Sequence, residues 1–297
     1  MNLYSFIYLC FIYFFFTLYN STDIINYKFQ ILFSGILIST FGIAHGSIDN
    51  FLVKKRYDLN NFEFYSLYLV SIVLYIIVWL ISPKIAFLSF LLLSAYHFGE
   101  SHFSDYNILS YYKKIFYMIW GCMLISGLLF FNKNELIELS TNYNNSNFLF
   151  LYNFEHLSLI FYLLSFISFI ILIILTIKKE LKIQELFSEL IHFFLIVLTF
   201  YLFPILLSFT LYFIFIHSLR SLNHEFKYLK TKIKNFNILK FFLILLPHTV
   251  IAQIFIILTV VLIHMEIIKI SIPIALLMII SSVTFPHAIV MTKFYNK

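Results

Sequence analysis

The chain has 297 residues, of which 62% are hydrophobic and 11% charged, and its mean hydropathy is +0.94. Soluble domains are roughly 45–50% apolar and about 25% charged, so this composition excludes an ordinary water-soluble domain. The formal net charge is +6, but the sequence has no glycine-rich phosphate loop and no nucleic-acid-binding signature. Cys10 and Cys122 have no CxxC partner, so the sequence supports neither a disulfide framework nor a thiolate metal site.

Apolar runs of roughly 15–25 residues are long enough to cross a bilayer as helices. The sequence contains ten such runs, at 3–19, 29–45, 64–81, 85–99, 112–131, 157–177, 186–203, 204–219, 241–264 and 271–291. The first run lacks the basic start and the cleavage site of a signal peptide, so we expect it to be a retained helix. The pattern predicts an all-α polytopic membrane protein, a bundle of about ten transmembrane helices that forms one domain over residues 1–297.

The lysines and arginines divide unequally between the loops of this predicted bundle. With the N-terminus in the cytoplasm, most of the 20 basic residues, including Lys54, Lys55 and Arg56, fall in cytoplasmic loops. This distribution agrees with the positive-inside rule. It predicts a multi-pass protein of the cell (plasma) membrane whose N- and C-termini are both cytoplasmic.

Residues 225–240, EFKYLKTKIKNFNILK, alternate apolar and basic side chains. Phe226, Leu229, Ile233 and Phe236 recur at helical spacing, which is typical of an amphipathic helix lying on the cytoplasmic surface of the lipid bilayer. A solvated basic loop is the alternative interpretation.

Four histidines lie inside or at the ends of the apolar runs: His45, His97, His217 and His287. Ionisable residues are costly in hydrocarbon and tend to mark function, and imidazole is a common ligand of iron, copper and zinc. In the predicted topology all four come to the cytoplasmic side on different helices. Helix bundles build metal sites from such facing side chains, so we expect a histidine metal site near the cytoplasmic side. The alternative for each is an interfacial histidine that bonds a helix end or a headgroup.

Other polar residues near these histidines are candidates for supporting roles. Asp49 and Glu100 lie within one helical turn of His45 and His97, so each could accept the second N–H of a metal-bound imidazole. Solvated charges at the level of the headgroups are the alternative for both. We interpret His192 and His248 as core or supporting groups rather than ligands.

Four short blocks carry a resemblance to a known family. The blocks AHGSIDN (44–50), AYHFGES (95–101), HSLRS (217–221) and PHAIVM (286–291) are similar, in the same order, to the PHGxxDH, YHFG, HSxRH and PHxxxM blocks of the Brp/Blh family of membrane β-carotene 15,15'-dioxygenases. The first block departs from the family pattern, with Ala44 for the usual proline and Asn50 for the usual histidine.

The resemblance implies a non-haem Fe(2+) ion. The residues that match the family's ligands, and that would be the catalytic residues, are His45, His97 and His217. Where the family has a further histidine four residues after the third of these, this chain has Ser221, whose hydroxyl is a poor iron ligand. His224, His287 or a water is then the candidate for the remaining position, and Ser221 a supporting polar residue.

The resemblance also implies a reaction: iron-dependent cleavage by O2 of the central 15,15' double bond of β-carotene to two retinal molecules, with a rhodopsin as candidate retinal acceptor. Two other functions stay open. A non-catalytic relative would bind carotenoid or retinal without turnover because Ser221 replaces a ligand. A transporter would use the histidines to relay protons or metal ions, and would spread them across the membrane depth.

Overall fold

The computed structural model describes residues 3–22, 27–52, 60–109, 111–142 and 146–295. These residues form helices joined by short connections, and no strand occurs among them. The prediction of an all-α protein is confirmed for this part of the chain.

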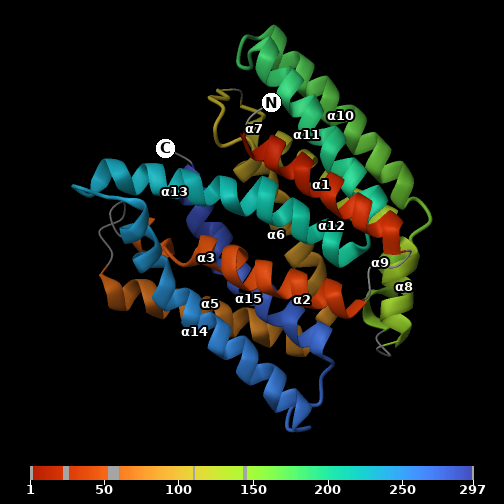
Figure 1. Ribbon diagram of the computed structural model, residues 1–297, viewed down its shortest axis with the longest axis vertical. Coiled ribbons are helices and arrows are strands. Elements are labelled where there is room, and N and C mark those ends of the chain that lie inside the picture. The colour runs from red at the N-terminus through yellow and green to blue at the C-terminus, as the bar shows by residue number, and fades with distance from the viewer. Residues whose placement is uncertain (1–2, 23–26, 53–59, 110, 143–145, 296–297) are drawn as a thin grey trace. The chain divides into compact units, whose positions relative to one another are not determined.

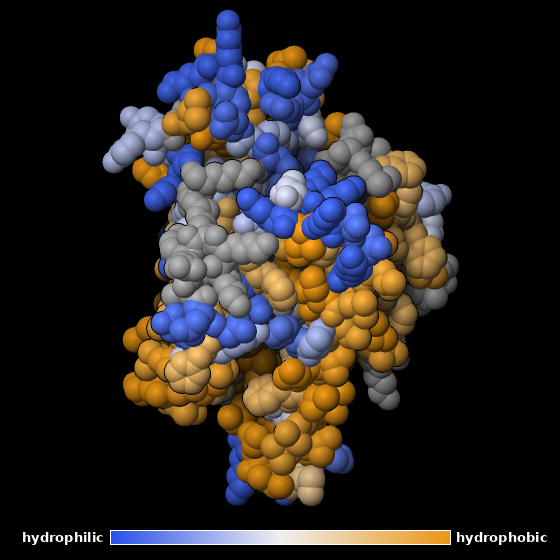
Figure 2. All heavy atoms as spheres, turned by 90° about the vertical axis from the view of Figure 1, so that its left-hand side faces the viewer, coloured by the Kyte–Doolittle hydropathy of each residue, from blue (hydrophilic) through white to orange (hydrophobic). Residues whose placement is uncertain are grey.

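Eight helices in the described residues are long and apolar enough to cross a membrane: Phe29–Leu52, Asn61–Ile81, Lys113–Phe131, Leu157–Ile177, Ile183–Leu202, Ile205–Lys232, Ile238–His264 and Ile272–Tyr295. Large apolar side chains lie exposed along them, among them Leu80 (68%) and Ile177 (74%). Figure 2 shows hydrophobic residues over much of the face that it draws. Because so large an apolar surface is stable in hydrocarbon but not in water, the helices indicate a membrane protein.

The expected count of about ten spanning helices is not confirmed. Two further predicted spans also form helices but are not among these eight. The apolar segment Ser5–Leu18 lies in α1 (Leu3–Thr22). In α6 (Pro83–His102) the last turns carry His97, Glu100 and other polar side chains, which lower its hydropathy.

Tertiary contacts divide the chain into two compact units. The first comprises Met1–Ile38 and Ala95–Ser221, and the second comprises Ser39–Ser94 and Leu222–Lys297. Each unit therefore combines segments that are far apart in the sequence. A single domain over residues 1–297 stays a prediction.

The first unit contains α1, α2 (Tyr27–Leu37), the end of α6, α7 (Lys113–Phe131), α8 (Lys133–Asn142), α9 (Leu149–Tyr152), α10 (Leu157–Ile177), α11 (Ile183–Leu202), α12 (Ile205–Leu211) and the π-helix η3 (Tyr212–Ser218). Helices α7, α10 and α11 pack side by side (Figure 1). A Cβ atom on Gly99 would lie 1.9 Å from the Tyr117 oxygen, and one on Gly121 would lie 1.6 Å from the Ala95 oxygen. Only glycine permits such backbone contact, so these two residues fix α6 against α7.

The second unit contains the π-helix η1 (Ile38–Gly42), α3 (Ile43–Gly46), α5 (Asn61–Ile81), the start of α6, α13 (Leu219–Lys232), α14 (Ile238–His264) and α15 (Ile272–Tyr295). A capping box starts α5, because the Asn60 side chain accepts from the Glu63 N–H and Glu63 accepts from the Asn60 N–H. Helix α5 packs along α15 (Figure 1), and the Trp79 indole donates to the Ser281 hydroxyl at 2.8 Å.

Residues 225–240 do not form the single amphipathic helix that the sequence predicts. Helix α13 ends at Lys232 and α14 begins at Ile238. Two members of the expected lipid-facing stripe are buried in the protein: Leu229 is 1% exposed and Phe236 is 6% exposed. The ring of Phe236 packs on that of Phe226, with centroids 5.7 Å apart. The apolar spacing therefore reflects tertiary packing.

The cytoplasmic location of the termini stays a prediction. Three basic residues that support it, Lys54, Lys55 and Arg56, lie outside the described residues. Lys178 and Lys182 lie in the short connection between α10 and α11.

Candidate metal-binding histidines

Two of the four histidine blocks are associated with π-helical turns. The π-helix η1 runs directly into α3, which carries His45, and η3 contains His217 itself. A π-turn adds a residue to the helical repeat and re-aims the side chains that follow, and such turns are frequent at functional sites. The apolar runs in the sequence predicted only regular helix here.

In the second unit His45 on α3 faces His287 on α15. Their Nε2 atoms lie 2.9 Å apart, and the rings are almost perpendicular, at 89°. The residues are only 2% and 6% exposed. The absence of a side chain on Gly46 gives the second ring room, because a Cβ atom there would lie 3.3 Å from Nδ1 of His287. The first and fourth blocks thus contribute facing imidazoles.

A carboxylate lies behind each of these two rings. Nδ1 of His45 is 3.0 Å from Oε1 of Glu225, and Nδ1 of His287 is 3.0 Å from both oxygens of Asp49. Asp49 also accepts from the Tyr68 hydroxyl at 3.0 Å. We call His45, His287, Asp49 and Glu225 the carboxylate-backed pair.

The hydrogen bonds of the carboxylate-backed pair determine which ring nitrogens can bind a cation. An imidazole that donates Nδ1–H to a carboxylate presents its Nε2 lone pair on the opposite side. Two neutral rings in this tautomer place two lone pairs 2.9 Å apart, a repulsion that a shared proton or a metal ion relieves. The two buried carboxylates also require positive charge nearby. The donor set therefore fits a metal cation.

The carboxylate partners in the structure differ from the candidates in the sequence. Asp49 was a candidate partner of His45, but its described contact with a histidine is with His287. The partner of His45 is Glu225, which is fully buried and which the sequence analysis placed in an interfacial segment. An isolated acidic residue among the lysines of 225–240 was the available signal.

In the first unit His97 on α6 and His217 in η3 lie together. Their ring centroids are 4.9 Å apart, and the residues are 2% and 3% exposed. The rings of Phe98 and Phe213 flank His217, with centroids 4.8 and 5.4 Å away. The second and third blocks therefore also contribute a pair of buried imidazoles, here with aromatic walls.

Ser221, the residue at the family's further histidine position, is 1% exposed, and its hydroxyl oxygen is 3.0 Å from that of Ser101. It thus takes part in a buried hydrogen bond. Glu100 is also 1% exposed and accepts from the Tyr96 hydroxyl at 3.2 Å. The alternative in which Glu100 is a solvated charge at the headgroups is therefore wrong.

The two histidines that are candidates for the remaining ligand position lie in different surroundings within the second unit. The ring of His287 faces His45, another predicted ligand. His224 is half-buried, and its ring packs against Tyr295, with centroids 6.5 Å apart. The geometry of this unit therefore favours His287.

Asn50, which replaces a family histidine, lies in a short hydrogen-bonded chain of the second unit. Its amide donates to the Tyr65 hydroxyl at 2.9 Å, and that hydroxyl is 3.0 Å from Nε2 of His248. This contact agrees with the interpretation of His248 as a supporting group.

Comparison with known proteins gives one match. No curated protein and no solved structure matches the chain significantly. The family model of Beta-carotene 15,15'-dioxygenase matches residues 36–295. This range includes all four histidine blocks and most of the chain, and it confirms the resemblance seen in the motifs. The chain therefore belongs to the beta-carotene 15,15'-dioxygenase family.

Proposed function

We propose that this protein is an iron-dependent dioxygenase of the membrane that uses O2 to cleave the central 15,15' double bond of β-carotene into two retinal molecules. Membership of the family supports a carotenoid dioxygenase-type function. The observation that carries the proposal to this chain is the carboxylate-backed pair, in which two buried imidazoles face each other through Nε2 at 2.9 Å.

The proposed cofactor is Fe(2+), with His45, His97 and His217 as its ligands and His287 as the candidate that compensates for Ser221. Imidazole nitrogen is a suitable ligand for iron. When bound, the ion would supply the redox chemistry with O2 that no protein side chain provides.

The protein's own residues would orient the ligands and keep their surroundings apolar. Glu225 and Asp49 each lie 3.0 Å from an imidazole Nδ1, and such contacts fix the orientation of a ligating ring and make it a stronger donor. Phe98 and Phe213 line one side of the His97–His217 pair. Aromatic walls suit a rigid polyene and exclude water. β-Carotene dissolves in the bilayer, so it could enter from the lipid between the exposed apolar helices.

A second candidate function follows from Ser221. Its hydroxyl already contacts Ser101 at 3.0 Å, so the family's ligand position is occupied by a residue engaged elsewhere. A relative that binds a carotenoid or retinal without turnover would fit this observation.

The two functions are distinguished by expression of the chain in a bacterial host that accumulates β-carotene, with iron supplied, and measurement of retinal in lipid extracts. The enzyme predicts retinal from the wild type and none from His45→Ala. A matched control is His156→Ala, which alters an exposed histidine and should keep full activity.

Failure of the wild type to make retinal would contradict the enzymatic proposal if the protein is inserted in the membrane in normal amounts. Retinal from Ser221→His but not from the wild type would identify Ser221 as the cause and favour the binding function.

A further inference from the structure

The first unit holds another group of buried metal-ligating side chains, outside the four family blocks. His102 lies at the end of α6, and Glu189 and His192 lie on α11. Glu189 is 0% exposed, and the two histidines are 3% and 2% exposed. We call these three residues the Glu-x-x-His cluster.

Local structure brings the three side chains of this cluster together. Residues three apart share a helix face, so the sequence Glu189-Leu-Ile-His192 presents a carboxylate and an imidazole side by side. A Glu-x-x-His spacing is also how some helix bundles present metal ligands. His102 is held in place from α6, which Gly99 and Gly121 fix against α7.

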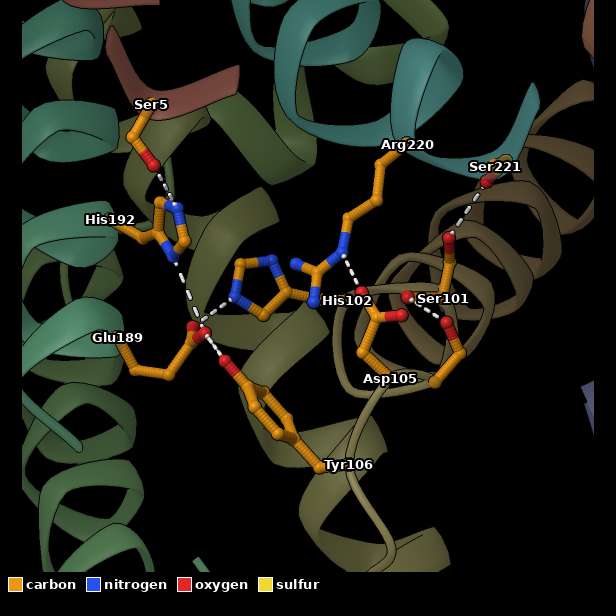
Figure 3. A network of polar contacts seen from close by, with 10 residues as sticks. Ser5, Ser101, His102, Asp105, Tyr106, Glu189, His192, Arg220 and Ser221 are labelled. Atoms are coloured by element: carbon orange, nitrogen blue, oxygen red, sulfur yellow. Dashed lines mark hydrogen bonds and ion pairs between the residues drawn. The ribbon is translucent and has the colours of Figure 1, made fainter. Parts of the chain in front are cut away.

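The carboxylate of Glu189 lies between two imidazoles (Figure 3). Its Oε2 is 2.5 Å from Nε2 of His102, and its Oε1 is 3.3 Å from Nδ1 of His192. One ligand atom from each of the three residues lies within 4.8 Å of the others. The three side chains are therefore close enough to share one ion, which would replace the two direct hydrogen bonds.

Other side chains hold the outer edges of the cluster. The Tyr106 hydroxyl donates to Oε1 of Glu189, and the Ser5 oxygen is 2.5 Å from Nε2 of His192 (Figure 3). With a metal on Nδ1, His192 would carry its proton on Nε2 and donate it to Ser5. Metal-binding histidines usually donate their second N–H in this way.

Charge also favours a cation here. Arg220 is only 7% exposed; its Nε–H donates to Asp105 at 2.9 Å, and its charge also acts on Glu189 (Figure 3). With neutral imidazoles, one guanidinium then faces two carboxylates, which leaves one negative charge unmatched. Such a charge is costly unless a cation or a protonated partner neutralises it.

We propose that the Glu-x-x-His cluster binds a divalent transition-metal ion of the zinc or iron class, through Nε2 of His102, Nδ1 of His192 and the carboxylate of Glu189. Two imidazoles and one carboxylate form a ligand set that both metals accept. The ion would fasten α6 to α11, and through Ser5 it would also hold α1. This site does not depend on the function proposed above.

The test is Co²⁺ titration of the detergent-solubilised full chain after removal of its metals with a chelator. The protein used carries His45→Ala and His287→Ala, so the carboxylate-backed pair no longer contributes. We expect one Co²⁺ ion to bind, with visible d–d absorption and a rise in Tm. Adding His192→Ala should weaken that binding at least 100-fold.

Two further variants make the result decisive even if His192→Ala does not fold. Ser5→Ala removes the contact to Nε2 of His192, and Tyr106→Phe removes the hydroxyl that donates to Glu189. Each should weaken Co²⁺ binding by roughly 10–100-fold, whereas His156→Ala should leave it unchanged. The proposal would be overturned if no Co²⁺ bound, or if the affinity for Co²⁺ were the same in all of these variants. The cluster would then be held by hydrogen bonds alone.

Discussion

The carboxylate-backed pair of the second unit and the Glu-x-x-His cluster of the first contain the same kinds of side chain, imidazoles and carboxylates, in different arrangements. In the pair each carboxylate lies behind an imidazole, on Nδ1, and the two Nε2 atoms face each other. In the cluster the carboxylate lies between the imidazoles. The arrangement in the pair keeps the carboxylates away from the metal position and suits an ion with sites open to O2. The arrangement in the cluster makes the carboxylate a ligand and suits a structural ion.

The largest expected effect is a loss of retinal production when the carboxylate-backed pair, but not the Glu-x-x-His cluster, is altered. His287→Ala removes one of the two facing imidazoles, so retinal production should fall to the level of the host without the gene. The amount of membrane-inserted protein should change little, because Asp49, which loses its imidazole partner, keeps the hydrogen bond from the Tyr68 hydroxyl. Retinal in lipid extracts and immunoblots of the membrane fraction measure the two quantities. Full activity of this variant would remove His287 from the proposed ligand set.

Substitution in the Glu-x-x-His cluster should lower the stability of the protein rather than its activity. Glu189→Leu removes the acceptor that two imidazoles and the Tyr106 hydroxyl share. Breaking a buried charged network by loss of one partner costs about 3–5 kcal/mol, so the unfolding temperature in detergent should fall by several degrees. Retinal made per folded molecule should stay near the wild-type value. A loss of turnover with unchanged stability would reverse the roles assigned to the two groups.

Glu225→Gln tests whether the carboxylate behind His45 acts through the ring. The amide oxygen can still accept from Nδ1–H, but the negative charge that makes the imidazole a stronger donor is gone. We expect iron affinity and retinal production to fall by roughly 10–100-fold, with iron per protein measured by mass spectrometry. The matched control is Glu138→Gln, an exposed acidic residue whose change should have no effect. Equal effects of both changes would exclude a specific role for Glu225.

The sequence predicted the histidines but not which carboxylate contacts which histidine. His45, His97, His217 and His287 were evident because ionisable side chains stand out in apolar runs. That His45 faces His287 depends on how α3 meets α15, and no local pattern records such a contact. Glu225 was missed because the lysines around it resemble a membrane-surface segment.

The Glu-x-x-His cluster had a weaker signal in the sequence. His192 was interpreted as a core or supporting group rather than a ligand, and His102, which lies just after the second block, was passed over. The helical turns that carry His45 and His217 were expected to be regular, because the apolar periodicity does not reveal a π-turn. The helices themselves were predictable, since length and hydropathy are local properties.

The smallest expected effect comes from a half-buried carboxylate that has no histidine in its described contacts. Glu135 on α8 accepts from the Ile205 N–H at 2.8 Å, and burial raises the pKa of its carboxyl above the ordinary value despite that bond. Because the folded-state pKa is the higher one, Glu135 stabilises the fold at low pH. That contribution is lost as the pH rises from the unfolded-state pKa through the folded-state pKa.

Glu135→Gln keeps an acceptor for the Ile205 N–H but cannot ionise. Its unfolding temperature should therefore decline less than that of the wild type as the pH is raised from 4 to 7, a difference that a pH series of thermal unfolding in detergent measures. Glu189, by contrast, has two imidazoles and a tyrosine around it, and its replacement should be costly at neutral pH. If the two carboxylates instead gave the same response to pH and substitution, burial alone would set their energetics, and the histidines around Glu189 would contribute nothing to its charge balance.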